Sequence, residues 1–172
     1  MAYLKDERPE TKMLDGNWAV GSYRYKAPRL LEEFANGLKD KKIVGTLCTG
    51  CGKVIVPPRA ICGRCHQRMD ERMVVSNWGT VTCFVISPPV VKGKYLVMGI
   101  DPVDAGMMKV GEVLVPVFVR FDGSDSNIAT IIYNIDPKDV HIGLRVQALW
   151  AKEPKGQLSD LEGVEPIGKP GK

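Results

Sequence analysis

The fold of this chain is decided by residues 48–66, which read CTGCGKVIVPPRAICGRCH. The stretch contains two Cys-x-x-Cys pairs, Cys48/Cys51 and Cys62/Cys65, with ten residues between them. Each pair, with glycine beside it, can form a tight knuckle that presents two thiolates to a metal ion. Two knuckles complete a tetrahedral four-sulfur shell, the geometry that Zn²⁺ favours. We therefore predict a structural zinc site, because four thiolates leave no open coordination position for water or substrate.

Other uses of these cysteines have weaker support in the sequence. A redox Cys-x-x-Cys requires a helix N-terminus within a βαβ unit, and neither pair has that setting. Disulfides require an oxidising compartment, whereas residues 1–12 are rich in charge and lack the apolar segment of a secretory signal. No run approaches the roughly 18 apolar residues of a membrane span, so we expect a cytoplasmic protein. Two variants stay open: His66 could replace Cys65 as a ligand, and iron could occupy the same four-sulfur geometry.

The bulk properties are those of a folded protein with a mildly basic N-terminal half. The chain has 172 residues, 44% of them hydrophobic, and a net charge of +4. This length suffices for one ordinary core or two small modules. Residues 1–75 carry 14 Lys and Arg against 9 Asp and Glu, whereas residues 76–151 carry 6 against 7. This distribution suits a small polyanion near the cysteines better than a long nucleic-acid track.

The N-terminal part contains one predicted helix. We expect residues 1–27 to be polar and irregular, and Pro28 to open the helix, because its missing N–H is not needed there. Leucine and phenylalanine then recur at helical spacing, at Leu30, Leu31, Phe34 and Leu38. This apolar face could pack in the core or dock on a partner. We take residues 1–42 as an N-terminal extension and helix.

The remainder of the chain is predicted to be mainly β. Residues 43–75 form the zinc ribbon, residues 76–151 a second domain, and residues 152–172, rich in Gly, Pro and charge, a flexible tail. Alternating Val, Ile, Thr and aromatic residues predict strands at 73–77, 79–87, 95–101, 113–121, 128–135 and 144–151. If the first two are one long strand bent at Gly79, the count is five, as in an OB-type Greek-key barrel.

The order of helix, four-cysteine ribbon and barrel resembles a known family. The resemblance covers residues 29–151 and is carried by the two Cys-x-x-Cys pairs, the Val56-Pro-Pro-Arg59 turn and Gly79-Thr-Val81. The family is that of the zinc-ribbon/OB-fold proteins of acyl-CoA metabolism, long catalogued as a domain of unknown function. The resemblance implies a rubredoxin-like zinc ribbon followed by a five-stranded OB-fold barrel. It also implies an accessory subunit of a thiolase (acetyl-CoA C-acyltransferase type), for example in a β-oxidation-like degradation route, with coenzyme A at the shared surface. Some members of the family partner an enoyl-CoA hydratase-like enzyme instead.

The residues themselves favour an accessory role over catalysis. A thiolase-type reaction requires a cysteine nucleophile activated by a histidine base. Once zinc takes four cysteines, Cys83, His66 and His141 remain. Cys83 lies in an alternating apolar strand and is expected to be buried, and His141 lies in a predicted surface turn. We therefore predict no catalytic residues in this chain.

Basic residues around the ribbon are candidates for binding coenzyme A. Guanidinium groups bind phosphates well, and coenzyme A has a pyrophosphate and a 3′-phosphate. Arg59 follows two prolines, so we expect it on a stiff turn, with Pro58 beside it and Lys53 near in sequence. Arg64 is a weaker candidate. Arg59 could equally pair with a carboxylate inside the ribbon or cover its apolar side.

Nucleic-acid binding is the alternative from another functional class. Zinc ribbons and OB folds both serve it, and strand aromatics can stack on bases of single strands. A groove that follows phosphates should be basic, whereas the predicted barrel is slightly acidic. We therefore favour other partners over nucleic acid, which stays the alternative, and we expect no membrane. The resemblance implies a thiolase-superfamily protein and coenzyme A or acyl-CoA as partners.

Overall fold

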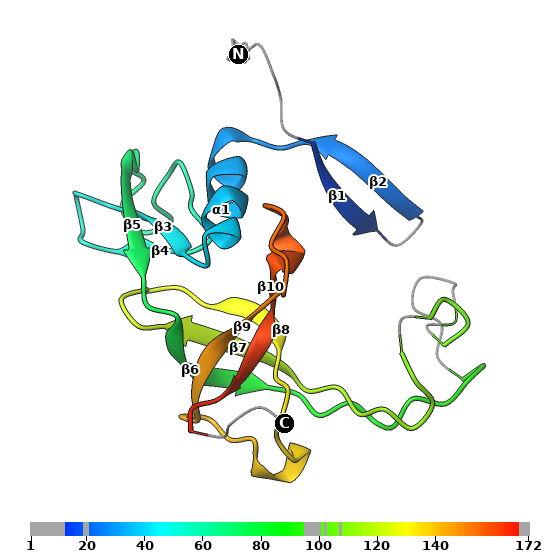
Figure 1. Ribbon diagram of the computed structural model, residues 1–172. Helices are drawn as coiled ribbons and strands as arrows, with labels where there is room; N and C mark the ends of the chain where they lie inside the picture. The colour runs from blue at the N-terminus through cyan, green and yellow to red at the C-terminus, as the bar shows by residue number, and fades with distance from the viewer. Residues whose placement is uncertain (1–12, 19–20, 95–100, 102, 107, 169–172) are drawn as a thin grey trace.

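The computed structural model describes residues 13–18, 21–94, 101, 103–106 and 108–168. Figure 1 shows the helix and a small three-stranded sheet above a larger curled sheet, with a hairpin on the far side of the helix. The hairpin consists of β1 (Met13–Trp18) and β2 (Gly21–Lys26), paired antiparallel. The prediction of irregular structure before Pro28 is therefore wrong for these residues. The β1–β2 hairpin forms by backbone pairing and does not require an apolar face, so the hydrophobic pattern of the sequence did not indicate it.

The predicted helix is confirmed as α1 (Arg29–Lys39), with Pro28 at its N-cap position. Its buried residues are Phe34, Ala35, Gly37 and Leu38. Phe34 and Leu38 belong to the main hydrophobic cluster of the molecule, and Leu31 packs against it. The apolar face therefore packs in the core, which answers the question that the sequence left open.

The zinc-ribbon segment is built on a three-stranded sheet. Its strands are β3 (Ile43–Leu47), β4 (Val54–Ile55) and β5 (Glu71–Val75), in the order β4-β3-β5. Both pairings are antiparallel. Gly45 lets β3 approach closely, because a Cβ atom there would lie 2.8 Å from the Ile55 carbonyl oxygen. This sheet carries the two cysteine knuckles in the connections on either side of β4.

The larger sheet is a strongly curled, five-stranded antiparallel half-barrel. Its strands are β6 (Trp78–Phe84), β7 (Pro116–Phe121), β8 (Ile128–Ile131), β9 (Arg145–Trp150) and β10 (Leu161–Pro166). The order is β10-β9-β6-β7-β8. A parallel bridge between Ile132 and Val164 brings the two edges together, and the Tyr133 N–H donates to the Val164 carbonyl at 2.9 Å. The predicted fold class, a zinc ribbon followed by a five-stranded OB-type sheet, is confirmed.

The fifth strand is not the one that the sequence predicted. The expected strand at 95–101 lies outside the described residues apart from Asp101, which is not in a strand. Instead, β10 forms from the segment predicted to be a flexible tail and pairs with β9. The tail prediction is therefore wrong at Leu161–Pro166. Glycine, proline and charge suggested disorder, but Val164 is fully buried and the backbone pairing with β9 compensates for the polar composition.

The predicted long bent strand is also wrong. β5 and β6 belong to different sheets, so the chain leaves the ribbon at Ser76 and Asn77 and enters the barrel at Trp78. The register shift of β6 against β7 lies between Val81 and Cys83, not at Gly79. Gly79 permits close packing instead, since a Cβ atom there would lie 2.8 Å from the Arg120 carbonyl oxygen.

Two short 3₁₀ turns complete the described elements, η1 (Pro137–Asp139) before β9 and η2 (Leu158–Asp160) before β10. Burial alternates strictly along β7, with Val117, Val119 and Phe121 buried. These side chains and α1 share one hydrophobic cluster. No helix in the described part of the chain is both long enough and apolar enough to cross a membrane.

Candidate metal centre and the adjoining pocket

The two cysteine knuckles have the same backbone pattern. In the first, Cys48 N–H donates to the Lys53 carbonyl at 2.8 Å, and Gly52 N–H donates to the Cys48 carbonyl at 2.7 Å. In the second, Cys62 N–H donates to the Gln67 carbonyl at 2.9 Å, and His66 N–H donates to the Cys62 carbonyl at 3.0 Å. Each knuckle thus turns its two thiols to the same side through a short hydrogen-bonded loop.

His66 occupies a backbone position rather than a ligand position. It follows the second cysteine of its knuckle as Gly52 follows Cys51, and both residues have a positive φ, 58° and 71°. The His66 side chain is exposed. Among the described residues, the cluster of possible metal ligands contains four cysteines and not His66. The alternative in which His66 replaces Cys65 therefore has no support in this geometry.

The structure brings together the four cysteines that the sequence proposed as ligands. All four sulfur atoms lie within 4.8 Å of one another. Cys48 and Cys65 Sγ are 3.3 Å apart, and Cys51 and Cys62 Sγ are 3.6 Å apart. These separations exceed the roughly 2.05 Å of a disulfide. They are close to the edge, about 3.8 Å, of a tetrahedron whose corners lie 2.3 Å from a zinc ion. The cluster is suited to a structural zinc ion.

The electrostatics of the cluster also fit a dication. The N–H groups of Cys65 and Arg64 lower the pKa of the Cys62 thiol to about 6. At Cys65, the N–H of Gln67 favours the thiolate, but the neighbouring Cys48 sulfur and burial outweigh it and raise the pKa to about 12. A negative charge therefore forms readily at Cys62, whereas the Cys65 thiol resists ionisation. A bound cation would remove this resistance by neutralising the crowded thiolates.

A pocket of about 380 Å³ lies beside the second knuckle. Its walls come from the ribbon and from the β7–β8 connection of the barrel. The ribbon contributes Lys53, Ile55, Val56, Pro57, Arg59, Cys62, Gly63 and Arg64, and the barrel contributes Asp125, Ser126 and Asn127. The knuckle that carries Cys62 is therefore a wall of the pocket, which ties the shape of the pocket to the metal centre.

Three of the four residues proposed for coenzyme A binding line this pocket. Lys53 is paired with Asp125 across the boundary between ribbon and barrel. Lys53 and the Val54 N–H together lower the pKa of the Asp125 carboxyl. Arg59 and Arg64 are exposed, and neither has an ion-pair partner among the described residues. The ribbon carboxylate considered as a partner for Arg59 is therefore not found in the described part of the chain. Pro58 is buried and does not line the pocket, whereas Pro57 does.

Hydrogen bonds from the barrel fix the floor of the pocket. The Asp125 carboxylate accepts from Val54 N–H at 2.9 Å, and Asp125 N–H donates to the Val54 carbonyl at 2.8 Å. The Ser126 hydroxyl bonds both main-chain groups of Val56 at 2.7 Å. Sequence reasoning missed this barrel loop, because its residues lie about 70 positions from those that they contact. Its one local signal is the polar run Asp122 to Asn127 between two strands.

The other chemically active residues do not gather near the pocket. Cys83 is exposed on β6, so the prediction that it is buried is wrong. The register shift next to it rotates the alternation of β6 and turns this side chain outward. His141 is exposed, and its Nδ1 lies 3.0 Å from the Asp139 carbonyl oxygen.

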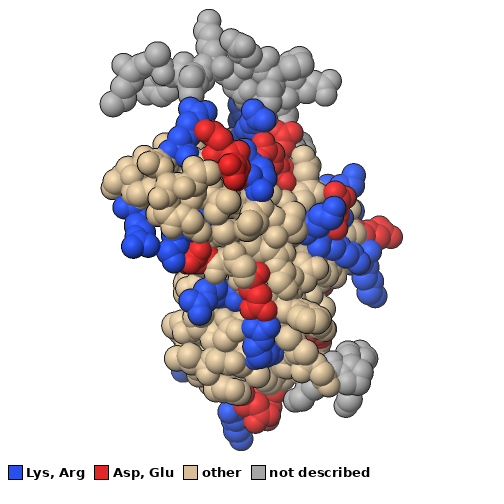
Figure 2. Space-filling view, turned by 90° about the vertical axis from the view of Figure 1, so that its left-hand side faces the viewer, with Lys and Arg blue, Asp and Glu red and all other residues tan. Residues whose placement is uncertain are grey.

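On the face seen in Figure 2, basic and acidic side chains are interspersed and separated by large uncharged areas. No continuous basic track crosses the coloured residues of that face. A nucleic-acid groove would be expected to have such a track.

Comparison with known proteins agrees with the ribbon and the barrel. Residues 35–70 match the family model described as ChsH2, rubredoxin-like zinc ribbon domain. A curated relative, the DUF35 domain-containing scaffold protein of Methanocaldococcus jannaschii, is 26% identical over 111 residues, which are 64% of this chain and 68% of the relative. These findings support a zinc-ribbon protein of the DUF35 family.

Two solved structures share the fold of this chain. A protein of unknown function from the DUF35 family of Sulfolobus solfataricus aligns with a TM-score of 0.58 and 19% identity, over 81% of this chain and 87% of its own. The Ltp2-ChsH2(DUF35) aldolase aligns with a TM-score of 0.55 and 17% identity, over 81% of this chain and 96% of the matched chain. At these identities the likeness concerns the fold alone.

Proposed function

We propose that this DUF35 protein is a non-catalytic, zinc-binding accessory subunit of a thiolase-superfamily enzyme that acts on acyl-CoA. Cys48, Cys51, Cys62 and Cys65 would hold the structural zinc ion, and Arg59 and Arg64, with Lys53, would bind phosphate groups of coenzyme A. The observation that carries the proposal is the pocket between ribbon and barrel, where two exposed guanidinium groups without an ion-pair partner among the described residues lie next to the metal knuckle.

The charges of the pocket support an anionic ligand. Lys53 already neutralises Asp125, so Arg59 and Arg64 supply the net positive charge. Guanidinium groups form paired, charge-assisted hydrogen bonds to phosphate oxygens. A volume of about 380 Å³ lies at the small end of ligand pockets and suits one end of coenzyme A rather than the whole molecule. The remainder of the ligand would extend toward the partner.

The zinc ion would act through structure alone. Four thiolates fill its coordination shell, so bound zinc cross-links the two knuckles. The knuckle that contains Cys62 then holds Gly63 and Arg64 at the wall of the pocket. The relatives are consistent with such a role, since one is named a scaffold protein and another forms part of an aldolase.

Coenzyme A binding by calorimetry tests the ligand part of the proposal. We expect Arg59→Ala and Arg64→Ala each to weaken binding about tenfold or more, the loss typical of one charge-assisted contact. Arg68→Ala is the matched control, because Arg68 is an exposed ribbon arginine already paired with Asp70. Equal losses in all three variants would indicate nonspecific charge attraction, and unchanged binding in all three would reject the pocket.

Co-purification tests the partner part of the proposal. The tagged chain should retain a thiolase-superfamily protein from native extract, and thiolysis of a 3-oxoacyl-CoA should fall when the chain is omitted. A partner that is stable and fully active alone would overturn this proposal. Recovery of an enoyl-CoA hydratase-type enzyme would replace the thiolase and keep the accessory role.

An aldolase is the second candidate partner, and the Ltp2-ChsH2(DUF35) aldolase is the observation that favours it. The two candidates differ in their co-substrate, because thiolysis consumes free coenzyme A and aldol cleavage does not. Assaying the purified complex with and without added coenzyme A therefore separates them.

A further inference from the structure

Two hydroxyl groups hold the Val56-Pro57-Pro58-Arg59 turn. Because prolines have no N–H, the turn has two backbone donors, at its first and last residues. On the barrel side, the Ser126 hydroxyl accepts a hydrogen bond from Val56 N–H at 2.7 Å. On the ribbon side, the hydroxyl of Thr46 on β3 accepts a hydrogen bond from Arg59 N–H at 3.0 Å. Each end of the turn is therefore anchored by a side chain that is distant in sequence.

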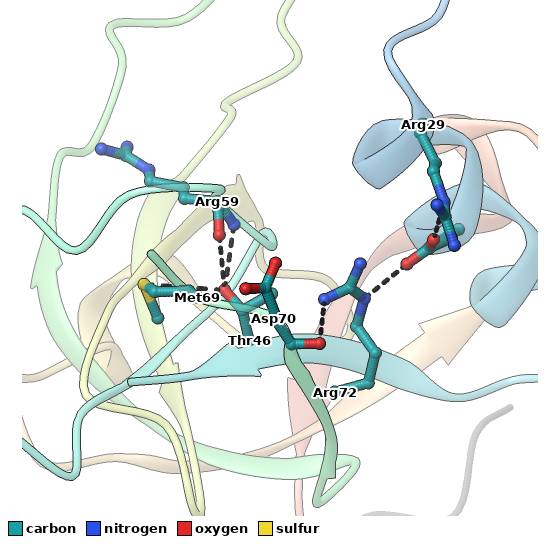
Figure 3. Close-up of polar contacts among 7 residues, drawn as sticks. Arg29, Thr46, Arg59, Met69, Asp70 and Arg72 are labelled. Carbon is teal, nitrogen blue, oxygen red and sulfur yellow. Dashed lines mark hydrogen bonds and ion pairs between the residues drawn. The ribbon is translucent and has the colours of Figure 1, made fainter. Parts of the chain in front are cut away.

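Thr46 bonds both main-chain groups of Arg59. Its Oγ1 accepts from Arg59 N–H at 3.0 Å and donates to the Arg59 carbonyl at 3.1 Å. The Met69 sulfur is 4.0 Å away and competes weakly for the same proton. Thr46 is fully buried, although its side chain is polar. In Figure 3, the Arg59 side chain extends from these bonds away from Thr46 and Met69.

We propose that Thr46 is a positioning residue for the anion site, and the inference rests on the function proposed above. Thr46 does not line the pocket, and Arg59 is the pocket residue that its hydroxyl contacts in the described part of the chain. Its main chain also pairs with Ile55 of the pocket, but a change of the side chain leaves that pairing in place. By fixing the main chain of Arg59, the hydroxyl restricts the conformations of this residue before a phosphate binds. Less conformational entropy is then lost on binding. Affinity rises when the binding group is held in place before the ligand arrives.

A purely structural role would have a different signature. A hydroxyl that only stabilises the ribbon would, when removed, lower stability without changing affinity in the fraction that remains folded. A positioning hydroxyl lowers the affinity of a chain that still has its zinc and its fold. Its effect also depends on Arg59, because Arg59 is the pocket residue that the hydroxyl contacts.

A thermodynamic cycle between Thr46 and Arg59 tests the proposal. Coenzyme A binding would be measured by calorimetry for the full chain, Thr46→Val, Arg59→Ala and the double variant. Valine keeps the shape of threonine and removes the hydroxyl. We expect Thr46→Val to weaken binding about tenfold in the full chain, which corresponds to one net hydrogen bond, and to have no further effect when Arg59 is alanine.

Three controls separate the possible outcomes. Thr46→Ser keeps the hydroxyl and should bind coenzyme A with an affinity within about twofold of that of the unaltered chain. Thr82→Val removes a hydroxyl that bonds the Phe118 carbonyl at 3.0 Å on the barrel, and should leave affinity unchanged. Zinc content and the unfolding midpoint identify a variant that has lost its fold. Equal weakening by Thr46→Val with and without Arg59 overturns the positioning role.

A measurement on the unaltered chain applies if Thr46→Val does not fold. Saturating coenzyme A should slow hydrogen exchange at the Arg59 amide, whose bond to Thr46 would tighten as Arg59 is held. Unchanged exchange in a chain that binds coenzyme A contradicts the inference. Absence of any coenzyme A binding to the full chain would instead overturn the proposed function, so the two failures are distinguishable.

Discussion

The ribbon and the barrel lie next to each other, yet different forces stabilise them. The buried residues around the metal centre are few: Cys48 and Cys62 with Met69 beneath them. The barrel interior is built from aliphatic and aromatic side chains, among them Val81, Val119, Phe121, Val146 and Val164. The knuckles, with so small an interior, require a cross-link. The barrel can rely on burial of apolar surface, in a cluster that also contains buried residues of the ribbon, namely Ile43, Val54, Val56 and Val75.

This difference determines how each region should fail. Metal binding and folding of the two knuckles are one equilibrium, so the knuckles lose their structure when one ligand is lost. A barrel held by many side chains loses stability in proportion to the volume removed from its core. Four substitutions, from the largest expected effect to the smallest, test whether the two regions behave in these separate ways.

Replacement of a buried cysteine should have the largest effect. We expect Cys62→Ser to lose most of its bound zinc, because three thiolates and a weakly ligating hydroxyl do not complete the shell. Amide exchange should then become fast in the ribbon and stay slow in β6, β7 and β9. Elemental analysis and hydrogen exchange measure the two effects.

Cys83→Ser is the matched control for that experiment. Cys83 is exposed on the barrel and lies outside the sulfur cluster, so its loss should leave zinc content unchanged. If Cys62→Ser keeps a full equivalent of zinc, or if the barrel loses protection together with the ribbon, the two regions do not have separate sources of stability.

A cavity in the barrel should destabilise the fold and leave the zinc content unchanged. We expect Phe121→Ala to lower the free energy of unfolding by about 3–5 kcal/mol while the chain retains its zinc, because Phe121 is 1% exposed. Phe118→Ala, three residues earlier on the outer face of β7 and 48% exposed, should cost much less. Urea denaturation and elemental analysis measure both variants, and equal costs would show that β7 does not carry the core.

The contact between the two regions should contribute less than either interior. Asp125→Ala removes the ion pair with Lys53 and the acceptor for Val54 N–H. We expect the free energy of unfolding to fall by about 1–2 kcal/mol, since a carboxylate that accepts a main-chain bond contributes more than an exposed ion pair. We also expect ribbon and barrel probes to show separate transitions.

Asp104→Ala provides the comparison for this contact. Asp104 pairs with Lys92, and both side chains are well exposed, so removal of this pair should change stability less. Transitions that stay coincident in Asp125→Ala would show that the two regions unfold together for another reason.

How much of this molecule could be predicted from its sequence depends on how local each signal is. Cys48-x-x-Cys51 and Cys62-x-x-Cys65 each carry their geometry within four residues, and the structure gathers them in one cluster. The alternation of Val117, Val119 and Phe121 likewise indicates one buried face. Signals of this kind come from residues that are neighbours along the chain.

The parts that the sequence did not reveal depend on distant partners. β10 has weak intrinsic preference for a strand and forms because β9 offers a free edge. The floor of the pocket comes from Ser126 and Asp125, and the bond from Thr46 to Arg59 joins two separate elements. Lys53 and Arg59 could be proposed as candidates, but the barrel loop that completes their pocket could not, because no local pattern specifies a contact across 70 residues.

The smallest expected effect belongs to an ion pair between the helix and the ribbon. The Glu33 carboxylate on α1 accepts from Arg72 on β5 and from Arg29. Figure 3 labels these two arginines. Arg72 first, and Arg29 after it, lower the pKa of Glu33 below its ordinary 4.5. A lowered pKa in the folded state stabilises the fold above the ordinary value, and this contribution is lost as the pH falls through the folded value. We expect Glu33→Gln to lower the free energy of unfolding by about 0.3–1 kcal/mol at pH 7, and this difference from the unaltered chain to shrink below pH 4.5.

Glu71→Gln, at an exposed carboxylate on β5 with no ion pair among the described residues, is the control. Thermal unfolding of the three chains between pH 7 and about pH 3 measures the effect, and a difference that grows on acidification would contradict it.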